Sequence, residues 1–181
     1  GDTPTFDGAA GTVLVIGFGR FGQLVTQVLL AEGVDVTVID RDVEQVRVAG
    51  RFGFKIYYGD GSRLDVLRAA GADKARVIAI CADAKDEVTA MVDLIQSEFP
   101  LARTFVRAYD RMHAIDLMNR DVDFHVRETM ESALAFGQAT IAELGVDPAR
   151  AAEIVEDVRK RDVARLVMQR SDGMLGGLDL L

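Results

Sequence analysis

Short apolar runs alternate with amphipathic stretches along the first two thirds of the chain. The apolar runs are rich in Val and Ile and are bounded by Gly, Asp and Pro, a pattern typical of strands buried on both faces of a parallel sheet. We expect strands at residues 12–16, 34–39, 54–58, 76–80, 104–107 and 123–126. Repeated strand–helix units of this kind predict an α/β fold: a doubly wound parallel Rossmann sheet of about six strands, which binds ligands at the carboxyl ends of its strands.

The stretches between these strands have helical periodicity. The first predicted helix carries Leu24, Val28 and Leu29 on one face, and the next are expected over residues 42–52, 63–70, 86–99 and up to Asn119. From Glu128 onward the pattern is helical only, with a wide apolar stripe at Met130, Ala133, Leu134, Phe136, Gly137, Ile141 and Leu144. Because a stripe of this width must be buried against something, it predicts a C-terminal helical extension that packs on another surface.

The domain boundaries follow from these patterns. We expect linker residues at 1–10, a Rossmann nucleotide-binding domain at 11–127, two helices at 128–170 and a flexible tail at 171–181. The second of those helices runs from Ala149 to about Arg170, with Asp147 as its N-cap and Pro148 at its first position. Proline is favoured at this position because the amide that it lacks has no helical partner there.

The loop after the first strand has the spacing of the dinucleotide-binding fingerprint, in the residues Gly17, Phe18, Gly19, Arg20, Phe21 and Gly22. The first glycine permits a tight turn, the second lets the backbone approach a phosphate, and the third lets helix and strand pack closely. The phosphate then rests on the free N–H groups of the helix terminus. The loop predicts an adenine-nucleotide site.

An acidic residue, Asp40, ends the second predicted strand. Its carboxylate would accept hydrogen bonds from the ribose hydroxyls and would repel a 2′-phosphate. The adjacent Arg41 moderates this repulsion only slightly. AMP or NAD(H) is therefore favoured over NADP, and the sequence leaves open which of the two is bound.

Two further clusters fall at the carboxyl ends of predicted strands: Asp60, Gly61 and Ser62 after the third strand, and Cys81, Ala82 and Asp83 after the fourth. The first cluster borders the expected adenine position, and Ser62 is also a suitable helix N-cap. Cys81 is read as a small buried apolar residue rather than a redox sensor. Arg107, at the end of the fifth strand, completes the set of expected binding residues.

Composition limits the other possibilities. The chain has 181 residues, 49% of them hydrophobic, and a formal net charge of −8, which argues against nucleic acid as a partner. One cysteine and two histidines provide neither a disulfide nor a cysteine-built zinc site. No apolar run approaches the ~20 residues that span a bilayer, so we expect the piece to be soluble and cytoplasmic.

The residues that a nucleotide-dependent enzyme requires are missing from the pattern. Tyr57, Tyr58 and Tyr109 lack the lysine four residues on that a short-chain dehydrogenase uses, and His113 and His125 each stand alone. The roughly 50 residues after Glu128 are too few and too helical for a substrate domain. The terminal hairpin of a methyltransferase sheet is also not visible. We therefore expect a regulatory domain, with a soluble NAD-dependent oxidoreductase or redox sensor as the alternative.

Three segments together carry a family resemblance: the glycine loop with Gln23, the cluster Tyr57-Tyr58-Gly59-Asp60-Gly61, and Arg127-Glu128-Thr129 leading into an alanine-rich helix. They resemble the cytosolic regulator-of-potassium-conductance domains (TrkA-N, or KTN-like) of potassium channels and transporters. The likeness is greatest to the C-terminal domain of the Kef glutathione-regulated potassium efflux antiporters, and it spans about residues 11–170.

This resemblance implies a cytoplasmic homodimer on the inner face of a bacterial membrane, tethered to a potassium/proton antiporter or docked on one as a free-standing subunit. It also implies that the apolar helix at residues 128–144 is the crossing helix between protomers, so that the helical extension serves dimerisation. It implies AMP or NAD(H) as ligand, with glutathione as a second effector near Arg127 and Asp162. Two departures from the Kef pattern bear on glutathione. Gln27 stands where Arg is common, and Asp162 stands where one branch has Asn.

Overall fold

A computed structural model describes residues 12–52 and 55–172 of the chain. Its elements in order are β1 (Thr12–Ile16), α1 (Arg20–Ala31), β2 (Asp35–Asp40), α2 (Val43–Ala49), a 3₁₀ turn at Gly50–Phe52, β3 (Lys55–Tyr58), α3 (Leu64–Ala69), a 3₁₀ turn at Ala72–Lys74, β4 (Val77–Ile80), α4 (Lys85–Glu98), β5 (Arg103–Ala108), α5 (Arg111–Asn119), β6 (Phe124–Arg127), α6 (Glu128–Glu143) and α7 (Pro148–Asp172). Every strand and helix expected from the sequence is present. The predicted strand start at Phe54, the linker at residues 1–10 and most of the predicted tail lie outside the described residues.

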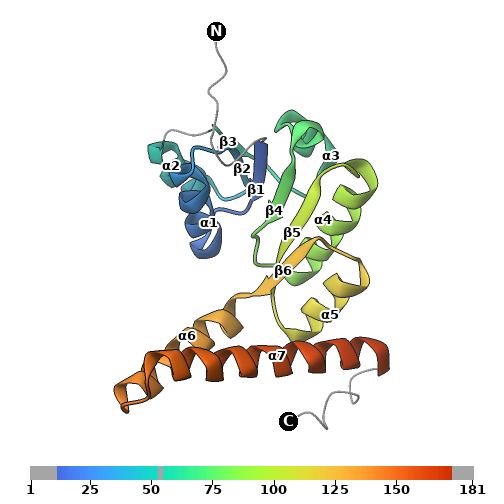
Figure 1. The fold of residues 1–181 in the computed structure, drawn as a ribbon. Coiled ribbons are helices and arrows are strands. Elements are labelled where there is room, and N and C mark those ends of the chain that lie inside the picture. Colours follow the sequence, from blue (N-terminus) through green and yellow to red (C-terminus); the bar gives the residue numbers. More distant parts are fainter. Residues whose placement is uncertain (1–11, 53–54, 173–181) are drawn as a thin grey trace. The chain divides into compact units, whose positions relative to one another are not determined.

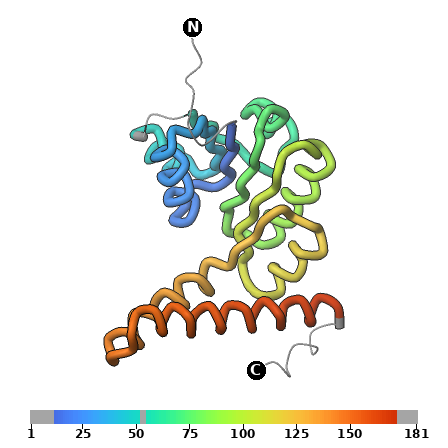
Figure 2. The backbone as a smooth tube through the Cα atoms, in the orientation of Figure 1, coloured from blue at the N-terminus to red at the C-terminus, as the bar shows by residue number. Residues whose placement is uncertain are grey.

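Contacts divide the chain into two compact units. The first runs up to Arg107 and also includes Val122–His125, and the second comprises Ala108–Asp121 and the chain from Val126 onward. Figure 2 follows the chain from β1 in blue to the α6–α7 hairpin in orange and red. The boundary passes through β6, and α5 belongs to the second unit, where it packs on α7.

The six strands have the order β3-β2-β1-β4-β5-β6, which is that of a doubly wound Rossmann sheet (Figure 1). β1 pairs in parallel with β2 and with β4, so that Ile16 lies between Ile39 and Ile80. The chain therefore leaves β1 and β4 toward opposite edges of the sheet. This divergence produces a crevice at their carboxyl ends, where doubly wound sheets bind ligands.

Buried side chains fill both faces of the central strands. On one face, Val15, Val38 and Ala79 form a cluster against which partly buried residues of α1 and α2 pack, among them Val25 and Leu29. The alternate residues Leu14 and Ile16 are buried on the other face. A continuous Val/Ile run is thus explained by helices on two sides, as the sequence predicted.

The predicted apolar face of α1 needs a correction. Leu24 and Val28 are 64% and 71% exposed, so they do not share the buried face with Leu29. The face toward the sheet instead carries Gly22 and Thr26, both buried. Small residues are needed on this face because α1 packs closely over the glycine loop. The spacing of apolar residues alone does not show that the buried face consists of small residues.

Apart from Ala108 of β5, Val126 and Arg127 of β6 and the connecting turns, the described residues of the second unit are helical. α6 and α7 pack against each other as a hairpin, and α7 starts where Asp147 caps the backbone N–H of Ala149 over 3.1 Å, as expected. The predicted tail is corrected at its start, because Ser171 and Asp172 still belong to α7. Among the described helices, none is both long enough and apolar enough to cross a membrane.

Candidate nucleotide site

The glycine loop joins β1 to α1 by a turn that only glycine makes without strain. Gly17 has a φ of +103°, and its N–H donates to the carbonyl oxygen of Ile39 over 2.9 Å. A Cβ at Gly17 would lie 2.8 Å from the backbone nitrogen of Ala82, and one at Gly22 would lie 1.9 Å from the carbonyl oxygen of Gly17. Both glycines are therefore required by the fold itself.

Gly19 is different, because space in front of it is open. The first atom that a Cβ there would meet is Oδ2 of Asp83, at 4.0 Å. Gly19 is the N-cap of α1 with no side-chain cap, and the first turn of the helix has no acidic residue. The N–H groups of this first turn can therefore donate hydrogen bonds to an anion in the open space. Phosphate groups bind at helix N-termini in this way.

Asp40 lies at the end of β2, beside this opening. Its Oδ2 accepts the N–H of Phe18 over 2.7 Å, and its Oδ1 accepts the N–H of Asp42 over 2.7 Å. Each carboxylate oxygen retains a second lone pair for a ligand hydroxyl. Asp40 thus fixes the loop at the same time as it faces the pocket.

A pocket of about 250 Å³ opens at the carboxyl ends of β1, β2 and β4. Nine of the residues predicted to bind the cofactor line it: Gly17, Gly19, Asp40, Arg41, Asp60, Gly61, Cys81, Ala82 and Asp83. Eight further lining residues were not among the predicted ones: Ile16, Ile39, Asp42, Gln45, Gly59, Ala84, Glu87 and Met91. Glu87 and Met91 lie on α4 at positions that only the packing of this helix brings to the crevice.

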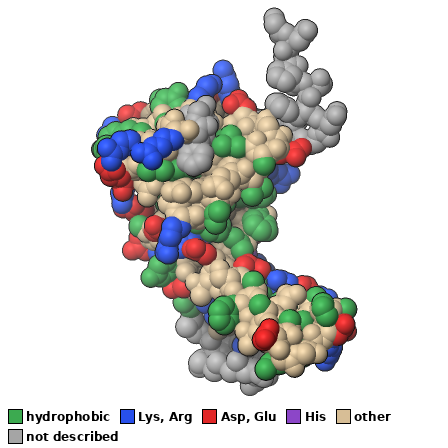
Figure 3. Space-filling view, turned by 90° about the vertical axis from the view of Figure 1, so that its left-hand side faces the viewer, with side chains coloured by type: hydrophobic (Ala, Val, Ile, Leu, Met, Phe, Trp, Pro, Cys, Tyr) green, Lys and Arg blue, Asp and Glu red, His purple; other side chains and the backbone are tan. Residues whose placement is uncertain are grey.

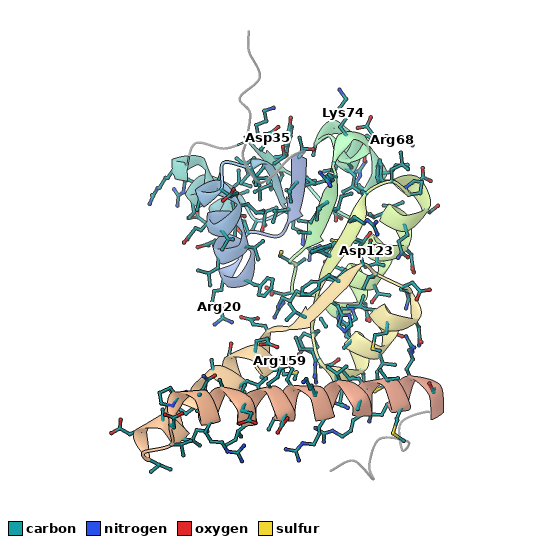
Figure 4. All side chains as sticks on the ribbon, in the orientation of Figure 1. Arg20, Asp35, Arg68, Lys74, Asp123 and Arg159 are labelled. Atoms are coloured by element: carbon teal, nitrogen blue, oxygen red, sulfur yellow. The ribbon has the colours of Figure 1, made fainter. Side chains whose placement is uncertain are left out.

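The remaining predicted residues lie around the pocket without lining it. Phe18 is buried, and Arg20 extends from the first turn of α1 into solvent (Figure 4). Arg107 pairs with Asp83 over 2.8 Å, and its guanidinium carbon lies 5.8 Å from the ring centroid of Phe21. Arg107 therefore positions Asp83 at the mouth of the pocket.

The turn after β3 is held by Asp60. Its Oδ1 accepts the Ser62 hydroxyl over 2.6 Å and the Ser62 N–H over 2.9 Å, and these two bonds lower the pKa of Asp60. Ser62 is thus bonded within the turn, and Arg63, not Ser62, is the N-cap of α3. The capping role predicted for Ser62 is wrong, because the neighbouring carboxylate holds its hydroxyl. Gly61 is required here, since a Cβ would lie 2.6 Å from Ile16.

Cys81 directly follows β4 and is buried, at 5% exposure. Desolvation raises the pKa of its thiol to about 12, with only a small opposing effect from Arg107. A thiol in this state is a poor nucleophile near neutral pH. The interpretation of Cys81 as a small buried apolar residue fits this geometry.

The second unit holds a separate charged cluster around Asp162, which is 8% exposed. Its carboxylate accepts bonds from Arg111 over 2.7 Å, from Arg165 over 3.2 Å and from Arg127. Arg127 and Asp162, both predicted to contact an effector, are therefore direct partners.

His113 is fully buried in α5, and its Nδ1 accepts the N–H of Tyr109 over 2.9 Å, so it is a satisfied polar core residue.

Comparison with known proteins assigns this fold and site to a family. The model of the TrkA-N domain matches residues 13–128. The chain belongs to the TrkA-N family. The chain is 48% identical to a glutathione-regulated potassium-efflux system protein of Haemophilus influenzae over 154 residues, which make up 85% of this chain. The chain spans about a quarter (25%) of the length of that relative.

Solved structures give the same result. The C-terminal domain of Kef from Shewanella denitrificans, solved with AMP bound, is 32% identical, with a TM-score of 0.82 over 88% of this chain and 98% of that one. The TrkA-N domain of an Escherichia coli inner membrane protein and the GsuK channel bound to NAD share the fold, with TM-scores of 0.65 and 0.62 at 20% and 18% identity. The match to the Escherichia coli domain covers 76% of this chain and 98% of that domain. The match to the GsuK channel covers 75% of this chain and 25% of the channel chain. Within the TrkA-N family, this chain is close to the Kef C-terminal domain.

Proposed function

We propose that this chain is the cytoplasmic regulatory domain of a potassium efflux system, a potassium/proton antiporter gated by AMP or NAD(H). The observation that carries the proposal is the pocket in which the open face of Gly19 and the carboxylate of Asp40 lie together. These two groups suit the phosphate and the ribose of one adenine nucleotide. The AMP-bound Kef domain, at 32% identity, supports the same ligand class.

The geometry favours a ligand that is sensed rather than transformed. Of the described residues that line the pocket, none is a histidine, lysine or tyrosine, and the buried thiol of Cys81 is protonated at neutral pH. General acid–base catalysis needs a group with a pKa near the operating pH. Gating requires instead that the nucleotide bind two conformations of the protein unequally.

The size of the pocket bears on the choice of nucleotide. A volume of about 250 Å³ lies below the roughly 300–1,000 Å³ of sites that enclose a larger ligand. NAD(H) carries a second nucleotide and therefore needs more room than AMP, so a pocket of this size favours AMP. We therefore propose AMP as the resident ligand and NAD(H) as a competitor for the same site.

The test is to identify what the purified domain binds. Nucleotide released by denaturing the protein is separated by ion-pairing chromatography and identified by its mass, and the emptied domain is titrated calorimetrically with AMP, NADH and NAD⁺. We expect AMP to be released, and AMP and NADH to compete on rebinding for one site per chain. A domain that releases no nucleotide and rebinds none contradicts the proposal.

We also propose a homodimer formed through α6. No residue of α6 is buried: Phe136 in the helix and Leu144 at its C-cap are each 79% exposed, whereas Leu134 and Ile141 are half-buried. A Cβ at Gly137 would meet nothing within 4 Å, so a second helix can approach closely there. Green hydrophobic side chains stand exposed on the surface in Figure 3. Covering such a face in a symmetric pair stabilises it by removing apolar area from water.

The dimer is tested with Phe136→Asp, which introduces a charge into this face. We expect light scattering to show the wild type as a dimer and the variant as a monomer with intact far-UV circular dichroism. Leu101→Asp is the matched control, because Leu101 is 95% exposed in the turn before β5. A dimeric Phe136→Asp protein would place the interface elsewhere.

Glutathione is the second proposed effector, at the cluster of Arg111, Arg127 and Arg165. Guanidinium groups bind carboxylates with paired hydrogen bonds, and glutathione carries two carboxylates. In this chain Asp162 already accepts one bond from each arginine. We therefore propose that glutathione competes with Asp162, and that its control is weaker than in relatives with a neutral residue at this position.

A further inference from the structure

Arg41 follows the ribose-binding Asp40 directly, and it is paired with a residue of α4. Its Nη1 lies 2.9 Å from Oε1 of Glu87, and both side chains line the pocket. The two are 58% and 39% exposed, so the pair lies at the rim and contributes little to stability. Because this ion pair at the rim of the pocket adds little to the stability of the fold, its effect on which ligand binds is the more informative property.

The charged side chains that line the pocket are mostly negative. Among the described residues that line the pocket there are five carboxylates, on Asp40, Asp42, Asp60, Asp83 and Glu87. Arg41 is the one Lys or Arg among them, and Glu87 holds it. In Rossmann domains that bind NADP, an arginine near the end of the second strand accommodates the 2′-phosphate.

We propose that Glu87 is a specificity-determining residue of the nucleotide pocket: it withholds Arg41 from a 2′-phosphate. The site then takes adenine nucleotides whose 2′-hydroxyl is free and rejects those that are phosphorylated there. Two effects combine. The guanidinium is engaged by Glu87, and the carboxylate of Glu87 adds to the negative field that a further phosphate must enter. This inference rests on the proposed nucleotide function and names the residue that sets its selectivity.

The experiment compares two ligands that differ only in the 2′-phosphate. AMP and adenosine 2′,5′-bisphosphate are titrated calorimetrically into the wild type, Glu87→Gln and the double variant Arg41→Ala/Glu87→Gln. We expect a strong preference for AMP in the wild type, reduced roughly five- to tenfold in Glu87→Gln, because the freed Arg41 gains a charge-assisted bond to the phosphate. In the double variant we expect this gain to be lost.

A matched control removes the same charge elsewhere on the same helix. Glu98 also lies on α4 and pairs with Arg68 over 3.2 Å, but it does not line the pocket. Glu98→Gln should keep the wild-type preference, and melting curves verify that each variant is folded. An unchanged preference in Glu87→Gln overturns the inference, and so does a gain that survives removal of Arg41. A wild type that binds neither ligand contradicts the proposed function as a whole, which is a distinguishable result.

Discussion

The backbone N–H of Phe18 donates to Oδ2 of Asp40 over 2.7 Å. This bond ties the glycine loop after β1 to the end of β2, 22 residues further along the chain. The other oxygen of Asp40 accepts the N–H of Asp42. A residue expected to bind only the ribose therefore also holds the loop in the conformation that a phosphate requires.

Replacing Asp40 should weaken nucleotide binding by more than the loss of a ribose contact. Asp40→Ala removes the ribose acceptor and also the hydrogen bond between Asp40 and the Phe18 N–H, so we expect the AMP affinity to fall at least about tenfold. Asp40→Asn keeps one oxygen acceptor and should lie between this variant and the wild type. Calorimetric titration measures both affinities.

The control for this pair is Asp35→Ala, at the opposite end of the same strand (Figure 4). Asp35 is exposed and does not line the pocket, so its removal should not change AMP binding. The dimer should persist in all three variants. Equal AMP affinities in Asp40→Ala and the wild type would remove Asp40 from the site.

Alanine substitutions at two glycines of the loop should have different effects, one on stability and the other on nucleotide binding. In Gly22→Ala the new Cβ would meet the Gly17 carbonyl oxygen at 1.9 Å, and relieving that clash should cost at least about 2 kcal/mol of unfolding free energy. In Gly19→Ala the Cβ meets open space, so the melting temperature should change little while AMP affinity falls. Thermal denaturation and titration of both variants test this contrast, and a stable Gly22→Ala protein would contradict it.

What the sequence predicted well is what depends on local pattern. The strand at residues 12–16 and the glycine spacing are local, and the structure has β1 at Thr12–Ile16 with Gly17 at positive φ. Glu87 and Met91 were missed because they reach the pocket from a helix far along the chain, and no spacing rule marks such residues. The exposure of Leu24 and Val28 was also not predictable, because the apolar pattern of α1 does not show which side meets the sheet.

Cys81 should be inert in the folded domain. Burial raises the pKa of its thiol to about 12, so the thiolate that reacts with alkylating agents is scarce from pH 7 to pH 9. We expect iodoacetamide at pH 8 to modify the native protein far more slowly than the unfolded protein in urea, as followed by mass spectrometry. Rapid modification of the native thiol would favour the redox-sensor alternative.

Asp162 should control both the stability of the second unit and its response to anions. Asp162→Ala would leave Arg111, Arg127 and Arg165 close together without their common carboxylate, which we expect to cost roughly 3 kcal/mol of unfolding free energy. Asp162→Asn keeps an oxygen acceptor but removes the negative charge. It should therefore cost less stability and leave the arginines available to a ligand carboxylate.

Glutathione binding distinguishes these roles of Asp162. We expect weak calorimetric heat for the wild type, tighter binding for Asp162→Asn, and loss of that gain in Arg127→Ala/Asp162→Asn, because Arg127 would supply the paired guanidinium. Exposed Arg150→Ala is the control for simple loss of a cation, since its partner Glu153 lies outside the cluster. Binding to the wild type as tight as to Asp162→Asn would show that Asp162 does not compete, and no binding to any of these proteins would remove glutathione as an effector.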